Sequence, residues 1–243
     1  KSGTAAAAQG AVYYVATTGF DTNTGTEALP WRTIQKAVDV AKPGDTIIVM
    51  PGNNDRTYIK TSGAPGYPII IKGFTSPDKS HVNMQELYDP HNPKLNIGNP
   101  NLNAVSRGFV FYPDLGKPSI KYIRIENFEI TNIYDPTKPF PQGGGIYLGG
   151  RLDTVTIENI EIVNNFLHDL NAKPPAENES FVNGIWGANR YVKNIFVKAN
   201  TLFHTQGTAI NVMGDTWLVE DNDVSHTLDT NTDSGATVNG DSD

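Results

Sequence analysis

Two copies of one phrase decide the fold of this chain: NIFVKANTLFHT, residues 194–205, and TWLVEDNDVSHT, residues 216–227. A third copy, NIEIVNNFLHDL, occupies residues 159–170, and the unequal offsets indicate loops of varying length. Apolar and polar residues alternate on both sides of a central Asn, which is the period of a strand with one buried face. Alignment of the copies predicts four columns: Ile160/Ile195/Trp217, Ile162/Val197/Val219, Asn165/Asn200/Asn222 and Leu167/Leu202/Val224.

An earlier copy and a second set of strands extend the pattern. YIRIENFEITNI, residues 122–133, reads as a copy with one residue fewer between its strands. A short strand that ends in Gly recurs in four segments, namely GGGIYLGG, NGIWGAN, TAINVMGD and GATVNGD. They predict an inward column of Ile146, Ile185, Ile210 and Ala236. Repeats of this length are typical of solenoids and propellers, and the absence of long blades or Leu columns favours an all-β, right-handed parallel β-helix.

The repeats need one another to fold. A rung of 22 residues loses about 1–2 kcal/mol of backbone entropy per residue. Its few inward side chains return only about 1.5–3 kcal/mol each, so the stability must come from stacking on neighbouring rungs. The recurring Asn is expected at a tight bend, where Asn tolerates left-handed geometry and bonds nearby backbone groups.

An amphipathic helix is predicted to close the first rung. Ile34, Ala37, Val38 and Ala41 have helical spacing, Thr33 is a suitable first cap, and Pro43-Gly44 ends the segment. We therefore expect a flexible leader at 1–11 and one β-helix domain at 12–243, with the cap at about 12–52 and rungs from about 46. The last repeat stops in the middle of a rung, so we expect C-terminal rungs to be lacking and a further segment or chain to complete the solenoid.

Composition narrows the possible functions. The 243 residues are 38% hydrophobic and carry a net charge of −7, which argues against a nucleic-acid binder because phosphate backbones require clustered Lys and Arg. The chain contains no Cys, which excludes disulfide and zinc-thiolate frameworks. No apolar segment is long enough to span a membrane.

A block near the start resembles a known group of proteins. YYVATTGFDTNTGTEALPWRTIQKAVDVAKPGDTIIVMPG, residues 13–52, is similar to the N-terminal cap and first rung of secreted β-helix proteins of polysaccharide lyase families 9 and 6. The residues that match in order are Tyr14, Gly19, Asp21, Asn23, Gly25, Thr26, Pro30, Thr33, Ile34, Gln35, Ala37, Ala41, Pro43, Gly44, Asp45, Pro51 and Gly52. Enzymes and binding proteins share such a cap, so it indicates the fold more directly than an activity.

The resemblance implies a secreted or cell-surface bacterial protein that acts on an acidic, uronate-containing polysaccharide by β-elimination. In such lyases calcium neutralises the substrate carboxylate and a Lys or Arg is the base. The weakly similar C-terminal segment suggests calcium ligands, and the catalytic base is expected beyond Asp243. The predicted metal ligands are Asp229, Asp233, Asp241 and Asp243.

Other side chains are candidates for binding. Tyr147 and Trp186 follow Ile146 and Ile185, so both should point outward from one sheet, where they either stack on sugars or pack beneath loops. Arg190 lies near the Pro-rich insertions and could meet carboxylates. One further column contains Asp169, His204 and His226. These side chains either bind a metal ion or transfer protons, or they are solvated polar residues at a corner of the rung.

Three functions remain open at this point. The first is a pectate lyase-like enzyme with calcium, and the second is a non-catalytic carbohydrate-binding or surface adhesion module. The third is a glycoside hydrolase, which needs two facing carboxylates; Asp241 and Asp243 could supply them. The insertions YDPTKPFPQ and NAKPPAENES follow strands at comparable points and are expected to wall a groove.

Overall fold

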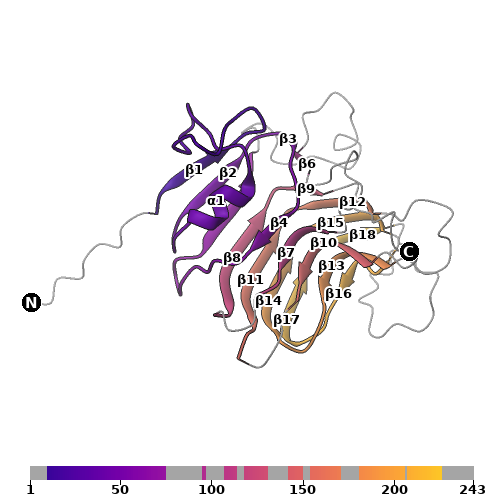
Figure 1. The fold of residues 1–243 in the computed structure, drawn as a ribbon. Helices are drawn as coiled ribbons and strands as arrows, with labels where there is room; N and C mark the ends of the chain where they lie inside the picture. The colour runs from indigo at the N-terminus through magenta and orange to yellow at the C-terminus, as the bar shows by residue number, and fades with distance from the viewer. Residues whose placement is uncertain are drawn as a thin grey trace, which may run out of the picture.

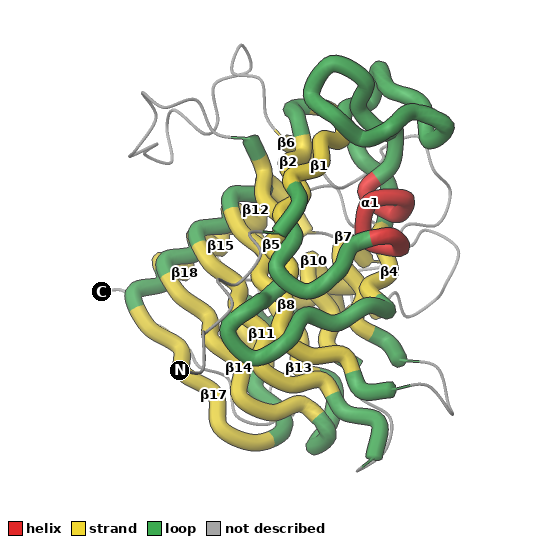
Figure 2. The backbone as a smooth tube through the Cα atoms, turned by 90° about the vertical axis from the view of Figure 1, so that its left-hand side faces the viewer, coloured by secondary structure: helices red, strands yellow, loops and turns green. Residues whose placement is uncertain are grey.

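The computed structural model describes residues 10–74, 95–96, 107–113, 118–130, 142–149, 154–170, 181–205 and 207–225. Their strands form three sheets of seven, six and five strands, here called sheets A, B and C (Figure 1). Each coil of chain adds one strand to sheet A, then to sheet B, then to sheet C, and every strand pairs in parallel with its counterpart in the next coil (Figure 2). The fold is the predicted parallel β-helix.

The strands divide among the sheets as follows. Sheet A contains β1 Val12–Val15, β2 Thr46–Val49, β5 Ile69–Gly73, β8 Ile120–Glu126, β11 Ile157–Val163, β14 Val192–Lys198 and β17 Asp215–Glu220. Sheet B contains β3 Gly52–Asn53, β6 Leu95–Asn96, β9 Glu129–Ile130, β12 Phe166–Leu170, β15 Thr201–Thr205 and β18 Asp223–Ser225. Sheet C contains β4 Thr57–Ile59, β7 Arg107–Phe111, β10 Gln142–Leu148, β13 Phe181–Gly187 and β16 Ile210–Asn211.

Columns of branched aliphatic side chains fill the interior. One column of sheet A stacks Ile47, Ile71, Ile125, Ile162, Val197 and Val219 in register. The predicted columns Ile160/Ile195/Trp217 and Leu167/Leu202/Val224 are confirmed. So is the alignment of Ile146, Ile185 and Ile210 in sheet C, whereas Ala236 lies outside the described residues.

The N-terminal cap has the predicted helix. Helix α1 spans Ile34–Val40, and the Thr33 hydroxyl accepts a hydrogen bond from the backbone N–H of Lys36 at 3.1 Å. Its buried face belongs to the same apolar core as the rungs. Strand β1 precedes the helix and pairs with β2, so the cap also extends sheet A by one strand.

Helix α1 also covers an edge of sheet C. The Gln35 side chain accepts the backbone N–H of Tyr58 at 2.9 Å and donates to the Tyr58 carbonyl at 3.0 Å. Strand β4 is the end strand of sheet C in the described residues, and α1 lies beside it (Figure 2). The helix therefore satisfies hydrogen-bonding groups that an open sheet edge would leave to a foreign strand.

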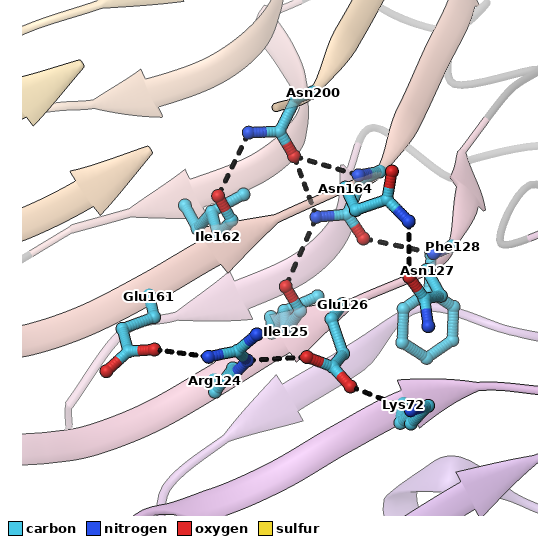
Figure 3. A network of polar contacts seen from close by, with 11 residues as sticks. Lys72, Arg124, Ile125, Glu126, Asn127, Phe128, Glu161, Ile162, Asn164 and Asn200 are labelled. Atoms are coloured by element: carbon cyan, nitrogen blue, oxygen red, sulfur yellow. Dashed lines mark hydrogen bonds and ion pairs between the residues drawn. The ribbon is translucent and has the colours of Figure 1, made fainter. Parts of the chain in front are cut away.

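The predicted Asn column is a hydrogen-bonded ladder between sheets A and B. The Oδ1 atom of Asn200 accepts from the N–H and the Nδ2 of Asn165 at 2.9 and 3.0 Å, and Asn222 accepts from Asn200 in the same way at 2.9 Å. Each Nδ2 also donates to the carbonyl of the preceding rung, as Asn200 does to Ile162 at 2.9 Å (Figure 3). These bonds satisfy backbone groups that the bend buries.

Two details of the ladder differ from the sequence prediction. The left-handed residue at the bend is the one before the ladder Asn, with φ values of 53° at both Asn164 and Ala199. The copy at 122–133 has as many residues between its strands as the copy at 159–170, because Ile125 pairs with Ile162 and Glu129 pairs with Phe166 at one constant offset. Phe128 therefore occupies the ladder position in that rung.

Phe128 ends the ladder inside the molecule because it has no side-chain donor or acceptor. Its backbone N–H donates to the Oδ1 of Asn165 at 3.0 Å, and its ring packs edge-on against Phe109 at 5.0 Å. The side chain is 1% exposed. An aromatic core residue thus replaces the amide where the polar column stops.

The outward face of sheet A is a network of alternating charges. Lys121, Glu158, Lys193 and Asp215 follow one another in register on successive rungs. Lys121 contacts Glu158 at 2.8 Å. Neighbouring columns hold the pairs Arg124–Glu161 at 2.9 Å and Lys72–Glu126 at 3.2 Å, both drawn in Figure 3. A one-residue slip would place these side chains on the apolar side, so the charges reinforce the register set by the core.

The last described rung is less buried than the others. Strand β17 has no fully buried residue, whereas β14 buries Val192, Ile195 and Val197. Val212, Trp217 and Val224 pack against the core while only partly buried. Residues 226–243 follow this rung and lie outside the described residues, so the expectation about further C-terminal rungs stays a prediction.

Replacement of Asn200 by Ala should destabilise the protein by about 2–4 kcal/mol, because the buried N–H and side-chain amide of Asn165 lose their acceptor. Urea unfolding measures the loss as a lower midpoint. Asn164→Ala is the matched control, since its side chain is exposed and Ala199 already adopts the same φ in the next rung; it should cost no more than about 1 kcal/mol. An equal loss of stability in the two variants would show that the Asn ladder does not stabilise the fold.

Stability should depend on the charge of Glu158. Burial disfavours the ionised form, but hydrogen bonds from Lys121 and Thr156 outweigh it and hold the pKa of Glu158 below its ordinary value. A lowered carboxyl pKa contributes stability that is lost as pH falls through the folded-state pKa. Glu158→Gln should therefore destabilise the protein at pH 7, with the difference from wild type shrinking toward acidic pH.

The pH series of urea midpoints tests this expectation. Glu27→Gln, at an exposed cap position, is the control for the loss of one negative charge and should show a smaller effect at pH 7. A difference between Glu158→Gln and wild type that is constant across the acidic range would show that the ion pair does not stabilise the fold.

Candidate functional site

The outward face of sheet C carries a column of large side chains. Tyr58, Val110, Tyr147, Trp186 and Asn211 occupy one register position on five successive strands. The neighbouring positions hold inward residues of the core, such as Ile146 and Ile185. Because side chains alternate along a strand, the inward Ile residues fix the outward direction of the aromatic residues that follow them.

Three aromatic rings contact one another along this face. The rings of Tyr147 and Trp186 are 5.0 Å apart and nearly perpendicular, and those of Tyr112 and Tyr147 are 6.2 Å apart. Tyr147 is only 8% exposed, whereas Tyr112 is 38% exposed and Trp186 is half-buried. The predicted pair Tyr147 and Trp186 is thus adjacent, but Tyr147 supports its neighbours and the accessible surface belongs to the other two.

A glycine makes room for the central ring. A Cβ atom at Gly149 would lie 2.3 Å from Cε1 of Tyr147, a distance that real side chains do not reach. The N–H of Gly149 also donates to the carbonyl of Phe111 at 2.8 Å, which holds the backbone close to the ring. The Gly that ends this strand in the sequence pattern therefore serves the packing of Tyr147.

Arg190 lies in the turn between β13 and β14. Its guanidinium stacks over the ring of Tyr191 at 5.0 Å and donates to the Tyr191 hydroxyl at 3.0 Å. These contacts place it beside Tyr191. Its predicted role in binding carboxylates stays a prediction.

The predicted calcium ligands cannot be placed. Asp229, Asp233, Asp241 and Asp243 lie outside the described residues, as does His226. Asp169 and His204 do occupy one register position, between the pairs His168–Phe203 and Leu170–Thr205. Within the described ranges, no group of three or more His, Asp or Glu side chains could hold a metal ion.

A buried acid–base pair on sheet B was missed at the sequence level. The Nε2 of His168 lies 2.7 Å from the Oε1 of Glu129, and both side chains are at most 8% exposed. The ring of Phe166 stacks on that of His168 at 4.2 Å. The two residues come from adjacent rungs, and only the corrected offset at 122–133 brings Glu129 beside Phe166, so the contact could not be predicted from the repeat pattern.

Searches against known proteins agree with the fold. The family described as a protein of unknown function (DUF1565) matches residues 17–77, about a quarter of the chain, and this region includes most of the block that resembles lyase caps. Among curated proteins, none matches the sequence. No helix in the described residues is long and apolar enough to cross a membrane.

Solved structures give the same result. The GH136 lacto-N-biosidase from Eubacterium ramulus is similar over 84% of this chain, with a TM-score of 0.53 and 18% identity. This chain covers 36% of that protein, and so spans about a third of its length. A rhamnogalacturonan lyase (TM-score 0.46, 16% identity, 86% of this chain and 45% of that one) and the pectate lyase Pel9A (0.36, 14%, 93% and 81%) are also similar. At 18% identity the likeness to the lacto-N-biosidase establishes the fold alone.

Proposed function

We propose that this chain is part of a carbohydrate-active β-helix protein and binds an extended, acidic polysaccharide along the outward face of sheet C. The observation that carries the proposal is the contact of Tyr112, Tyr147 and Trp186 across adjacent rungs. Aromatic faces bind the apolar faces of sugar rings and can hold a chain without closing around it. A secreted or cell-surface location would give access to such polymers.

The spacing of the rungs suits a sugar polymer. Parallel strands repeat every ~4.8 Å, which is close to the length of one sugar residue, so successive sugars of a chain lying across the strands would meet successive rungs. The rings of Tyr147 and Trp186, 5.0 Å apart on neighbouring rungs, follow this repeat. A surface that repeats with every rung favours a polymer over a small molecule.

The other two faces fit this role less well. On sheet A the outward charges are paired with one another, as in Lys121–Glu158 and Lys198–Glu220. On sheet B, Glu129 and His168 are buried. Within the described residues, sheet C presents the accessible rings of Tyr58, Tyr112 and Trp186, with the buried ring of Tyr147 between the last two.

The finer proposal is a pectate lyase-like reaction on a uronate polymer with calcium. When bound, calcium would neutralise the substrate carboxylate beside the proton that is removed. The described residues provide no calcium cluster, and the four candidate Asp residues lie outside them, so no catalytic step is assigned to residues of this chain.

A non-catalytic binding module is the second candidate. It is favoured because the described part of sheet C presents aromatic rings without a carboxylate pair or a metal cluster beside them. A binding module would retain the polymer unchanged.

Replacement of Trp186 by Ala should lower the affinity for polygalacturonate at least tenfold, because a half-exposed stacking surface is removed. Affinity electrophoresis and calorimetry measure the change. Phe196→Ala is the matched control, since Phe196 is a half-buried aromatic residue on the outward face of sheet A. Similar affinities of the Trp186 variant and the wild type would refute the proposed surface.

The lyase and the binding module are separated by product formation. Incubation with polygalacturonate and calcium should produce the ultraviolet absorbance of an unsaturated uronate if the chain is a lyase, and a chelator should remove the signal. Binding that occurs without absorbance would leave the binding module as the function of this chain.

A further inference from the structure

A pocket of about 160 Å³ lies in the cap, between the start of α1 and the turn that leads into β4. Its lining includes Thr17, Arg32, Gln35, Asp55, Arg56 and Thr57. Thr57 is buried and Arg56 is half-buried, so part of the wall belongs to the folded body of the cap. The pocket has room for one small ligand, and its lining combines two guanidinium groups, three hydroxyl groups and the carboxylate of Asp55.

The two arginines of the pocket differ from the cations on the outward face of sheet A that are held in ion pairs. On sheet A, Lys72, Lys121 and Arg124 each contact a glutamate. Within the described residues, neither Arg32 nor Arg56 has a carboxylate at ion-pair distance. With two arginines and one aspartate, the lining carries a net charge of 2 − 1 = +1, which favours an anionic ligand.

Hydrogen bonds hold the pocket wall around Arg32. Arg32 donates through one Nη1 bond of 2.7 Å to the carbonyl of Thr17. The carboxylate of Asp21 accepts the backbone N–H groups of Arg32 and Thr33 at 3.0 and 2.9 Å and the Thr33 hydroxyl at 2.8 Å. Asp21 thus orders the backbone beside the pocket, which reduces the entropy lost when a ligand binds.

The pocket borders the first member of the sheet C column. Arg56 lies over the ring of Tyr58 at 5.1 Å, and Gln35 holds the Tyr58 backbone through two hydrogen bonds. Tyr58 is 37% exposed and shares its register position with Val110 and, through it, with Tyr147 and Trp186. The arginine pocket therefore lies at the N-terminal end of the proposed sugar-binding face.

We infer that this pocket is a terminal subsite that binds the carboxylate of an acidic sugar through Arg32 and Arg56, with the sugar ring beside Tyr58. The inference rests on the proposed function in one respect, namely that the rest of the chain extends along sheet C. The pocket itself can be tested with a single sugar. A guanidinium forms a planar pair of hydrogen bonds with a carboxylate, which an uncharged sugar cannot reproduce.

Calorimetric titration of the whole chain with trigalacturonate and with a neutral trisaccharide, galactotriose, tests the inference. Arg56→Gln should lower the affinity for trigalacturonate about tenfold and leave that for galactotriose unchanged. Raising the salt concentration should weaken trigalacturonate binding to the wild type more than to the variant. Lys42→Gln removes the same charge at the other, exposed end of the helix and should leave both affinities unchanged.

Galacturonic acid alone separates this inference from the proposed function. Its binding, followed by NMR shifts of the ligand, should be lost in Arg56→Gln and in Arg32→Gln but retained in Trp186→Ala. If both arginine variants fold, as urea unfolding would show, and still bind the acid as the wild type does, the pocket is not the subsite and the sheet C proposal stands. If Trp186→Ala leaves polymer binding intact while the arginine variants lose the acid, the sheet C proposal fails and the subsite stands.

Discussion

The register between successive rungs is the constraint on which the whole structure depends. Each rung is too small to fold by itself, and its backbone groups find partners only in the rung above or below. In a sheet with one buried face, a slip of one residue would turn Ile125, Ile162 and Val197 toward solvent. The Asn ladder prevents such a slip, because the amide of Asn200 contacts both Asn165 and the carbonyl of Ile162 on the preceding rung.

The same register arranges three outer faces with different chemistry. Once the inward columns are fixed, the residues between them must point outward and form columns of their own, since each column repeats one position of the coil. On sheet A this stacking brings opposite charges together. On sheet C it brings aromatic rings together. A binding surface on a β-helix is therefore a consequence of the repeat, and its length grows with the number of rungs.

The sequence predicted what repeats, and it failed where a rung departs from the repeat. The columns of Ile160 and Asn165 were visible because the same residue types return at matching places. Phe128 broke the Asn column, and an alignment that sought an Asn at that position was wrong by one residue. Two-residue strands such as β3 and β6 could not be predicted, because they are too short to show a period.

In the candidate site, too, only the features that follow the repeat could be predicted from the sequence. Tyr147 and Trp186 could be assigned to one face from the inward Ile before each of them. The burial of Tyr147 could not, because it depends on Gly149 and on rings from other rungs. Arg32 and Arg56 are far apart in sequence from the repeats that identify sheet C, and only the turn into β4 brings them to one pocket. Two arginines and one aspartate give that pocket a net positive charge in a protein of net charge −7, so it is a place where an acidic ligand would meet an opposite charge.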